Sequence, residues 1–543
     1  MLDPKPRPCR PSAQTRVNFS SDELYDRLVR PDHPLRRLNE HLDLSFVRQT
    51  IEASGIYSRS SGRYGLEPEL FIRVSMLQTL YGVSDRDAVD EACANMAWKW
   101  FLGLEVEAAA GFDDTTLGKT RLRYASKGLL GLVQAQLTEA QAEGLVTPDD
   151  STHFIDSAVS IADAAVLKAV ELVRRVCGKL REALRPVLAQ ETVERLSQTD
   201  ETLRKDTSWL LGSELKEACL RKWSEHCAEL VALAEQLLAA PGAPGELGDW
   251  ARHEKRVLRQ LEIARHLLSD QEPKAASAKK DKLASPTDPE ARRSNRKSDG
   301  TKLGYRLHVE MDEESGLVVG FKGTASNCED GTALQELVTQ AEEQGLKPRA
   351  LAADSAYADG DNRAFLKEHE IEQYIPQPRP KPSKKGWYVA TDFVYDAHAQ
   401  TVTCPAGVVC GNAHEQASKG GWNFYYALAM CANCPKREQC VGEAPKHGRA
   451  VYISAHRPLL DEARQRQRTD EHKAALRRRM KIEHKLQRML NVMGLRRCRY
   501  RGLERFEIQL ALVSLLVNSE QLSKLKRKRE EKERGCQAQS QAA

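Results

Sequence analysis

The stretch ALAADSAYAD, residues 350–359, decides the fold that the sequence predicts. Its first four residues are apolar and suit a short buried strand, and the chain turns polar at Asp354. A carboxylate at the end of a buried strand can meet carboxylates from distant parts of the chain, and Asp156 and Glu483 lie in two segments suited to supply them. Three carboxylates arranged in this way would hold divalent metal ions for phosphoryl transfer.

The length and charge of the chain indicate several domains and an anionic partner. A chain of 543 residues is too long for one hydrophobic core, so we expect about three or four domains. The net charge is only +5, but residues 456–510 contain 16 Lys or Arg against 7 Asp or Glu. A local excess of positive charge favours a polyanionic partner, because each neutralised phosphate releases counterions. A solvent-exposed helix face is the alternative interpretation of such a run.

The thirteen cysteines do not by themselves indicate a secreted protein. The amino terminus lacks the apolar segment of a secretory signal, and no stretch approaches the 18 uninterrupted apolar residues of a membrane span. The sequence therefore predicts a cytoplasmic protein without a membrane partner. In that compartment clustered cysteines more often bind metal than form disulfides.

Helical patterns dominate two long regions. Residues 35–145 predict several short helices, of which the last is basic and carries Arg121 and Arg123. This is typical of a DNA-binding module, with a plain helical bundle as the alternative. Residues 165–299 predict a helical insertion that ends in a flexible linker. The arm 1–34 and the basic tail 523–543 are expected to be disordered.

Strand patterns appear between the helical regions. Residues 152–156 predict a strand with Asp156 at its end. Residues 304–323 alternate with period two on both sides of a turn, which predicts a hairpin, and residues 330–344 predict a helix before the strand at Ala350. Strand, hairpin, helix and strand, in this order, is the order of a ribonuclease H-like core.

A cysteine-rich region follows, over residues 381–464. Cys404 precedes a cluster formed by Cys431, Cys434 and Cys440. Four thiolates suit a tetrahedral zinc ion, and buried free cysteines are the alternative. A zinc ion with four thiolate ligands would be structural, because no position is left open for chemistry.

The third acid lies in a basic helix. Arg479 and Glu483 are four residues apart and share one helix face. A lone glutamate in such a helix is usually an ion-pair partner, so its functional role depends on the other two acids. The loop 494–502 that follows is basic and contains Tyr500, which suits contacts with phosphates and bases.

Together these segments resemble bacterial insertion-sequence transposases of the DDE class, in the group with a cysteine-rich insertion before the final glutamate. The resemblance is carried, in chain order, by Ile155-Asp156, residues 285–292, Gly304-Tyr305, residues 327–330, residues 353–357, the four cysteines, Arg479 with Glu483, and residues 499–502. Residues 70–122 are similar to the helical domain that opens such transposases. Each motif is modest by itself, and their order and spacing make the resemblance specific.

The resemblance implies an α/β fold with an all-α amino-terminal domain. The ribonuclease H-like catalytic core would consist of residues 150–164, 300–380 and 465–522, interrupted by the helical insertion and the cysteine-rich insertion. The chain departs from the family where related proteins have tyrosine and lysine around the final acid, since Leu476 and Leu490 stand there.

The resemblance also implies the chemistry. Asp156, Asp354 and Glu483 would bind two Mg²⁺ or Mn²⁺ ions, and Arg479 would orient Glu483 or bind phosphate near the cut. A homodimer would cut double-stranded DNA at the terminal inverted repeats of an insertion sequence and join the ends to target DNA at the bacterial nucleoid. The expected DNA contacts are Arg121, Arg123, Lys485, Arg488, Arg496, Arg497, Arg499 and Arg501.

Two other functions fit the same residues. A nuclease on the same core would cut DNA without joining the ends. A zinc-stabilised DNA-binding regulator would carry the three acids as ordinary surface charges.

Overall fold

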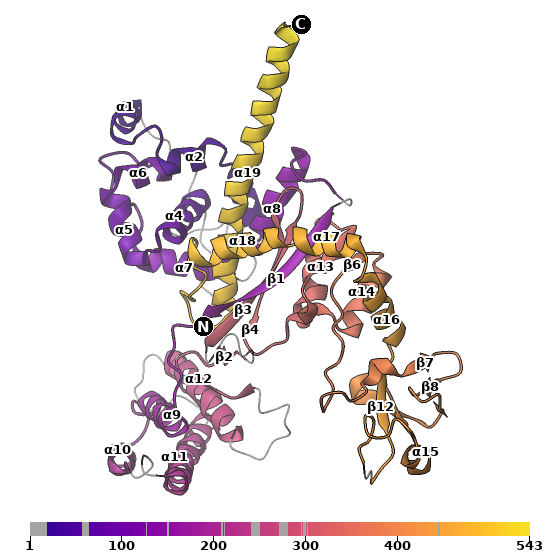
Figure 1. Cartoon of the computed structure of the whole chain (residues 1–543). Coiled ribbons are helices and arrows are strands. Elements are labelled where there is room, and N and C mark those ends of the chain that lie inside the picture. Colours follow the sequence, from indigo (N-terminus) through magenta and orange to yellow (C-terminus); the bar gives the residue numbers. More distant parts are fainter. Residues whose placement is uncertain are drawn as a thin grey trace.

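The structure is a computed structural model of the chain, shown in Figure 1. It describes all residues except 1–18, 57–64, 126–127, 149–150, 208–209, 211, 240–249, 271–280, 295, 297–299, 301, 444–445 and 543.

The amino-terminal part is helical. Its elements are α1 (Phe19–Leu28), α2 (Pro34–Glu40), α3 (Ser45–Ala53), α4 (Pro68–Tyr81), α5 (Asp85–Ala94), α6 (Met96–Leu102), α7 (Asp114–Ala125) and α8 (Leu129–Ala142). Phe71 and Ile72 in α4 are fully buried, and α4 ends at Gly82, whose positive φ (68°) suits glycine. Ser84 starts α5 through a capping box with Asp87.

Residues 19–34 belong to this helical part, so the prediction of a disordered arm over residues 1–34 is wrong there. Tyr25 in α1 is fully buried, and its hydroxyl donates to the Leu104 carbonyl (2.7 Å). Val29, one helical turn later, is buried as well. The two side chains attach the segment to the helical domain, and residues 1–18 lie outside the described part of the chain.

A mixed sheet forms the centre of the molecule. Its strands are β1 (Thr152–Ile161), β2 (Arg292–Arg293), β3 (Leu303–Asp312), β4 (Val318–Ala325), β5 (Ala350–Ala352) and β6 (Glu372–Tyr374). β1 is the middle strand: it pairs antiparallel with β3 on one side and parallel with β5 on the other. β4 pairs with β3 and β6 pairs with β5, so the predicted hairpin is confirmed.

The expectation that Asp156 ends its strand is wrong. β1 continues to Ile161, because residues 153–161 all pair with β3. Asp156 therefore lies in the interior of the central strand, where its backbone is held by the ladder with β3.

Helices cover both faces of the sheet. The elements are η5 (Asp330–Ala333), α13 (Leu334–Glu343) and α14 (Gly360–Glu368), and near the carboxyl terminus α16 (Arg457–Arg466), α17 (Asp470–Arg478), α18 (Met480–Asn491) and α19 (Leu503–Ala542). Ile155 packs with Leu334 and Leu337 of α13, whereas Phe154 belongs to the cluster that contains Leu486 of α18. Since side chains alternate along a strand, Asp156 shares the α18 face and Ser157 shares the α13 face.

The helical insertion has a core of its own. It consists of α9 (Ala169–Leu184), α10 (Gln190–Lys205), α11 (Ser213–Ala239) and α12 (Trp250–Ser269), which in Figure 1 lie below the sheet. Val170, Cys177 and Trp223 are fully buried in a cluster formed by the insertion. Its side chains therefore need no contact with the sheet to be buried.

The predicted flexible linker is wrong for the described residues from 281 to 294. Asp288 is fully buried, accepting from the Tyr305 hydroxyl (2.6 Å) and the Gly502 N–H (3.3 Å). Glu290 accepts from the Leu503 N–H (2.7 Å). These two acids bind amide groups at the start of α19 that have no partner inside the helix, and their charge suits a helix amino terminus.

The cysteine-rich region forms two small sheets. They consist of β7 (Val394–Asp396), β8 (Thr401–Thr403) and β9 (Val409–Cys410), and of β10 (Ala413–Gln416), β11 (Gly421–Tyr425) and β12 (Ala450–Ser454), with α15 (Leu428–Ala432) following β11. Phe393, Phe424 and Ile453 are buried in one cluster of this region. Figure 1 shows the region at the lower right.

The prediction of a disordered basic tail over residues 523–543 is also wrong, because α19 continues to Ala542. The segment is rich in Lys, Arg, Glu and Gln, which favour helix. Lys526 anchors its first turns by an ion pair with Glu143 (2.8 Å). Beyond this contact the helix projects from the molecule (Figure 1).

We predict that Tyr305→Phe lowers the free energy of unfolding by about 1–3 kcal/mol, because the buried Asp288 carboxylate loses its hydroxyl donor. Urea unfolding followed by circular dichroism measures the change. Tyr425→Phe is the matched control, since Tyr425 is 44% exposed, and we expect a change within about 0.5 kcal/mol. Equal effects of the two substitutions would contradict the role given to Asp288.

Candidate functional site

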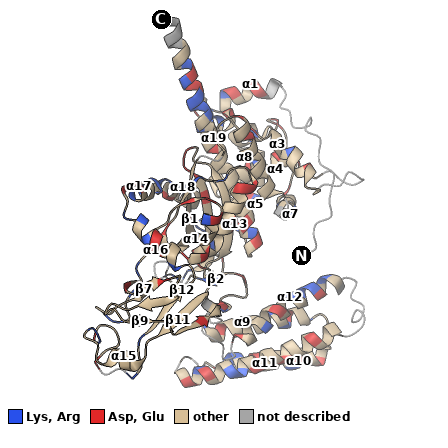
Figure 2. Ribbon diagram, turned by 90° about the vertical axis from the view of Figure 1, so that its right-hand side faces the viewer, with Lys and Arg blue, Asp and Glu red and all other residues tan. Residues whose placement is uncertain are grey.

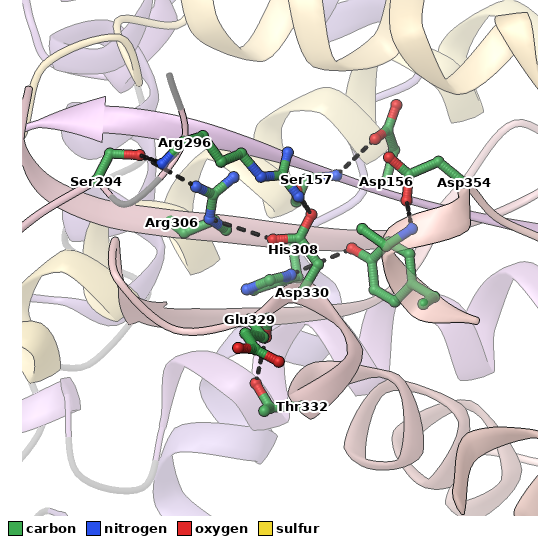
Figure 3. Close-up of polar contacts among 12 residues, drawn as sticks. Asp156, Ser157, Ser294, Arg296, Arg306, His308, Glu329, Asp330, Thr332 and Asp354 are labelled. Carbon is green, nitrogen blue, oxygen red and sulfur yellow. Dashed lines mark hydrogen bonds and ion pairs between the residues drawn. The ribbon is translucent and has the colours of Figure 1, made fainter. Parts of the chain in front are cut away.

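Two of the predicted acids lie on neighbouring parallel strands, Asp156 within β1 and Asp354 just after β5. β1 and β5 are in register at Phe154 and Ala352, so Asp156 and Asp354 lie two residues beyond the same paired position. Asp354 caps η6 (Ser355–Tyr357) and accepts from the Ala356 N–H (2.8 Å). Figure 3 shows the two side chains beside each other. The strand register therefore brings together acids that are far apart in the sequence.

Arg479 connects Glu483 to this pair. Its Nη1 lies 3.0 Å from Asp156 Oδ2, and its Nη2 lies 3.0 Å from Glu483 Oε1. Arg479 stands between α17 and α18, and α18 packs on β1 through Ile482 and Leu486. The site thus contains the three predicted acids and the predicted arginine.

The surroundings of Asp156 raise the pKa of its carboxyl group above the ordinary value. Burial raises the pKa of Asp156, and the nearby charge of Asp354 acts in the same direction. The Arg479 guanidinium and the Ser157 N–H lower the pKa again by stabilising the carboxylate. A further cation at this place would favour the charged form of the acids.

The donor atoms fit a hard divalent cation. Asp156, Asp354 and Glu483 offer carboxylate oxygens, which Mg²⁺ and Mn²⁺ prefer. Asp156 and Glu483 meet through the Arg479 guanidinium. Within the described residues no three His, Cys, Asp or Glu side chains are arranged so that they could hold a metal ion. The ligand set suits the metal, while the side-chain arrangement is that of an ion-pair network.

A second polar cluster lies on the other face of β1, and sequence reasoning did not assign it to the site. Ser157 Oγ donates to Asp330 Oδ2 (2.7 Å), and Asp330 also pairs with Arg306 (3.3 Å) and Arg296. Asp330 and Arg306 are almost fully buried. Figure 3 shows this network next to Ser157, the neighbour of Asp156.

His308 and Tyr357 extend the same cluster. His308 Nδ1 lies 3.2 Å from the Tyr357 hydroxyl, and its Nε2 lies 2.9 Å from Thr324 Oγ1. The alternating pattern of β3 could have indicated this face, because Arg306 and His308 occupy alternate positions between apolar residues of a buried strand. Polar residues at buried strand positions need partners, and η5 supplies one.

Two family models match the chain. The model described as "Transposase DDE domain" matches residues 278–519, and the one described as "Transposase domain (DUF772)" matches residues 23–123. The chain belongs to the DDE transposases. The first match contains Asp354, Arg479 and Glu483, whereas Asp156 lies between the two matched segments.

A curated relative of this transposase carries no assigned function. It is the protein of Rhizobium meliloti called "Uncharacterized protein ORF8 in nfe locus", which is 28% identical over 144 residues. The aligned part is 26% of this chain and 67% of the relative. No solved structure matches the chain.

Two of the arginines expected to contact DNA are buried, so those predictions are corrected. The Arg121 guanidinium pairs with Asp85 (2.7 Å) and lies over the Tyr500 ring, 4.8 Å from its centre. Arg121 and Arg123 are both buried. The basic helix α7 turns these arginines inward, and a sequence pattern of charge does not reveal this direction.

The other predicted contacts fall into two groups in this transposase. Arg496, Arg497 and Arg501 are exposed on the loop after α18. By contrast, Arg488 binds Glu520 (2.7 Å), Arg499 donates to the Gln78 carbonyl (2.9 Å), and burial lowers the pKa of Lys485 to about 8. The exposed group is better placed to meet a polyanion.

The four predicted zinc ligands lie in one part of the cysteine-rich region. Burial raises the pKa of the Cys440 thiol, and the neighbouring Cys431, Cys404 and Cys434 raise it further. Cys431 is buried, whereas Cys404, Cys434 and Cys440 are half-buried. The structure therefore groups the four thiols, although they do not converge on one point within the described residues.

None of the helices in the described residues is long and apolar enough to cross a membrane.

We predict that His308 causes the free energy of unfolding to fall as the pH is lowered. Burial lowers the pKa of His308 to about 4, below its ordinary value of 6.5. Between these pH values the unfolded chain binds a proton that the folded protein does not, so stability falls as the pH falls.

The comparison of wild type with His308→Gln tests this effect. Wild type should lose about 2 kcal/mol more than the variant between pH 7 and pH 5, measured by urea unfolding at each pH. The exposed His414 provides the control substitution His414→Gln, which should retain the wild-type pH dependence. Parallel curves for wild type and His308→Gln would contradict the prediction.

Proposed function

We propose that this transposase cleaves and joins DNA strands with the help of divalent metal ions held by Asp156, Asp354 and Glu483. The observation that carries the proposal is that the strand register places Asp156 near Asp354 while Arg479 joins Asp156 to Glu483. Asp156 lies within β1 and Asp354 follows its parallel neighbour β5, each two residues beyond the same paired position. Membership of the DDE transposases supports this use of the acids.

We infer that the sheet is a ribonuclease H-like core. In support, β1 lies between an antiparallel hairpin, β3 and β4, and two shorter parallel strands, β5 and β6. α13 lies on one face, and α18 and α19 lie on the other. In this arrangement the first acid is on the central strand and the second follows its parallel neighbour.

The protein groups have distinct roles in the proposed reaction. Bound Mg²⁺ or Mn²⁺ would supply Lewis acidity for activating water or a DNA 3′-hydroxyl and for stabilising the leaving oxygen. The β1 ladder and the Ser157 N–H hold the Asp156 carboxylate in place, and the capping bond to Ala356 holds Asp354. Arg479 can bind a phosphate near the cut, because a guanidinium offers two parallel donors.

We propose that the DNA lies across the exposed basic residues near α18. Arg496, Arg497 and Arg501 are exposed there. On the carboxyl-terminal part of α19, Lys524 and Lys528 are exposed and share one helix face. Figure 2 shows blue segments along this part of α19. These charges suit the terminal inverted repeats of an insertion sequence and its target DNA, which a homodimer at the nucleoid would hold as paired ends.

We predict that Asp354→Asn abolishes metal-dependent cleavage, lowering the rate at least about 100-fold, because a metal ligand and its charge are lost. Cleavage of DNA that carries the inverted repeats flanking the coding region measures the effect with Mg²⁺, Mn²⁺ or EDTA. Asp470→Asn is the matched control, since Asp470 in α17 is 99% exposed. Full cleavage by Asp354→Asn would refute the proposed site.

The same assay distinguishes a transposase from a nuclease on the same core. Joined products between cut ends and a target plasmid show strand transfer, and a nuclease gives only hydrolysed ends. Cleavage without joining, with Mg²⁺ present and the ends paired, would restrict the proposed activity to hydrolysis.

We also propose that Cys404, Cys431, Cys434 and Cys440 bind a structural zinc ion. The closeness of the four thiols supports this, since thiolates are the ligands of structural zinc. Binding would require rotation of the side chains toward one point. Cys431 is buried and Cys404 and Cys440 are partly buried in a region of short strands, which fits a domain that a metal ion stabilises.

We predict about one zinc ion per purified chain, measured by atomic emission spectroscopy. Cys434→Ser should lower the zinc content and the thermal stability of the protein. Cys93→Ser is the control, because Cys93 is exposed in the helical domain. Wild-type protein without zinc after expression in zinc-supplemented medium would contradict the proposal.

A further inference from the structure

Arg479 forms ion pairs with carboxylate oxygen atoms that a metal ion would also use as ligands. One of its terminal nitrogens lies 3.0 Å from Asp156 and the other 3.0 Å from Glu483. Its side chain is 15% exposed and that of Asp156 is 16% exposed, so the pair between them is largely shielded from water. Shielded charges interact more strongly than charges in bulk water.

The Arg479 bridge reduces electrostatic repulsion between the acids. Asp156, Asp354 and Glu483 carry like charges that repel one another when they are brought together. The Arg479 guanidinium offsets this repulsion for Asp156 and Glu483. A divalent cation would do the same with the same oxygens, so the cation and the guanidinium compete.

Arg479 differs in position from the basic residues next to it. Arg478 and Lys481 turn to the other side and bind Glu313 (3.0 and 3.1 Å). Arg479 lies at the junction of α17 and α18, and Lys481 and Glu483 at the start of α18 are exposed, so the surface next to Arg479 is open to solvent. A DNA phosphate on this surface can bind a guanidinium through two donors, as a carboxylate does.

We propose that Arg479 is an exchangeable counter-ion that couples metal loading to DNA binding. Without DNA, it holds Asp156 and Glu483 and opposes metal binding. A DNA phosphate takes over the guanidinium and releases both carboxylates to the metal. The coupling is reciprocal, so bound metal also strengthens DNA binding by the same factor. The proposal rests on the metal-binding role given to the three acids.

Mn²⁺ binding to the full-length protein without DNA tests the competition. Isothermal titration calorimetry should show that Arg479→Gln binds Mn²⁺ about tenfold more tightly than wild type, because the competing charge is gone. Arg478→Gln is the matched control and should bind as wild type does. Equal or weaker binding by Arg479→Gln would overturn the proposal and assign Arg479 to organising the acids.

A second measurement tests the link to DNA. Fluorescence anisotropy measures the affinity for a short labelled DNA duplex. Addition of Ca²⁺ should raise this affinity more in wild type than in Arg479→Gln. Arg478→Gln is the reference, because it shows how Ca²⁺ changes the affinity through charge screening alone when one arginine is lost. The same dependence on Ca²⁺ in all three proteins would overturn the coupling.

Two further variants separate failure of the proposed metal site from failure of the role proposed for Arg479. If the double variant Asp156→Asn, Asp354→Asn binds Mn²⁺ like wild type, the proposed metal site fails, whatever Arg479 does. Arg479→Lys keeps the charge but cannot bridge both acids with two terminal nitrogens, so its Mn²⁺ affinity should lie between those of wild type and Arg479→Gln. It serves as the test if Arg479→Gln does not fold.

Discussion

The pairing of β1 on both of its edges is the constraint on which the rest of the structure depends. Backbone hydrogen bonds to β3 and β5 fix the register of β1, and a shift by one residue would move every side chain to the opposite face. The present register puts Asp156 toward α18 and Ser157 toward η5. The candidate site and the buried polar cluster behind it are thus two consequences of one strand alignment.

Carboxylates on the two faces of β1 have different kinds of charged partners. On the α18 face the acids are partly exposed, and Arg479 offsets charge there by pairing with both Asp156 and Glu483. On the other face Asp330 is buried and held by Arg306, Arg296 and Ser157. A buried carboxylate with several fixed partners costs much to disturb, so this cluster is suited to holding the strand still while the acids on the opposite face change partners.

The start of α19 joins residues 285–292 to the central strands of the sheet. The acids of residues 285–292 bind amide groups there, and Asp288 also binds Tyr305 on β3. Cys498, just before this helix, donates its N–H to the carbonyl of Ile161 at the end of β1 (2.8 Å). A segment that carries the family resemblance therefore also has a structural role, because it joins the central strands to the last helix.

The order of strands and helices and the resemblance to DDE transposases followed from the sequence alone, because local periodicity and motif spacing are properties of the linear sequence. The hairpin of β3 and β4 followed from such a local pattern. Only the tertiary structure decided which way charged side chains point, since Arg121 turns inward to Asp85 while Arg479 reaches Asp156 from a distant part of the chain. It also decided that Asp330 binds Ser157 on the face of β1 opposite to Asp156. These features depend on partners distant in sequence, and no local pattern specifies which residues will meet across the fold.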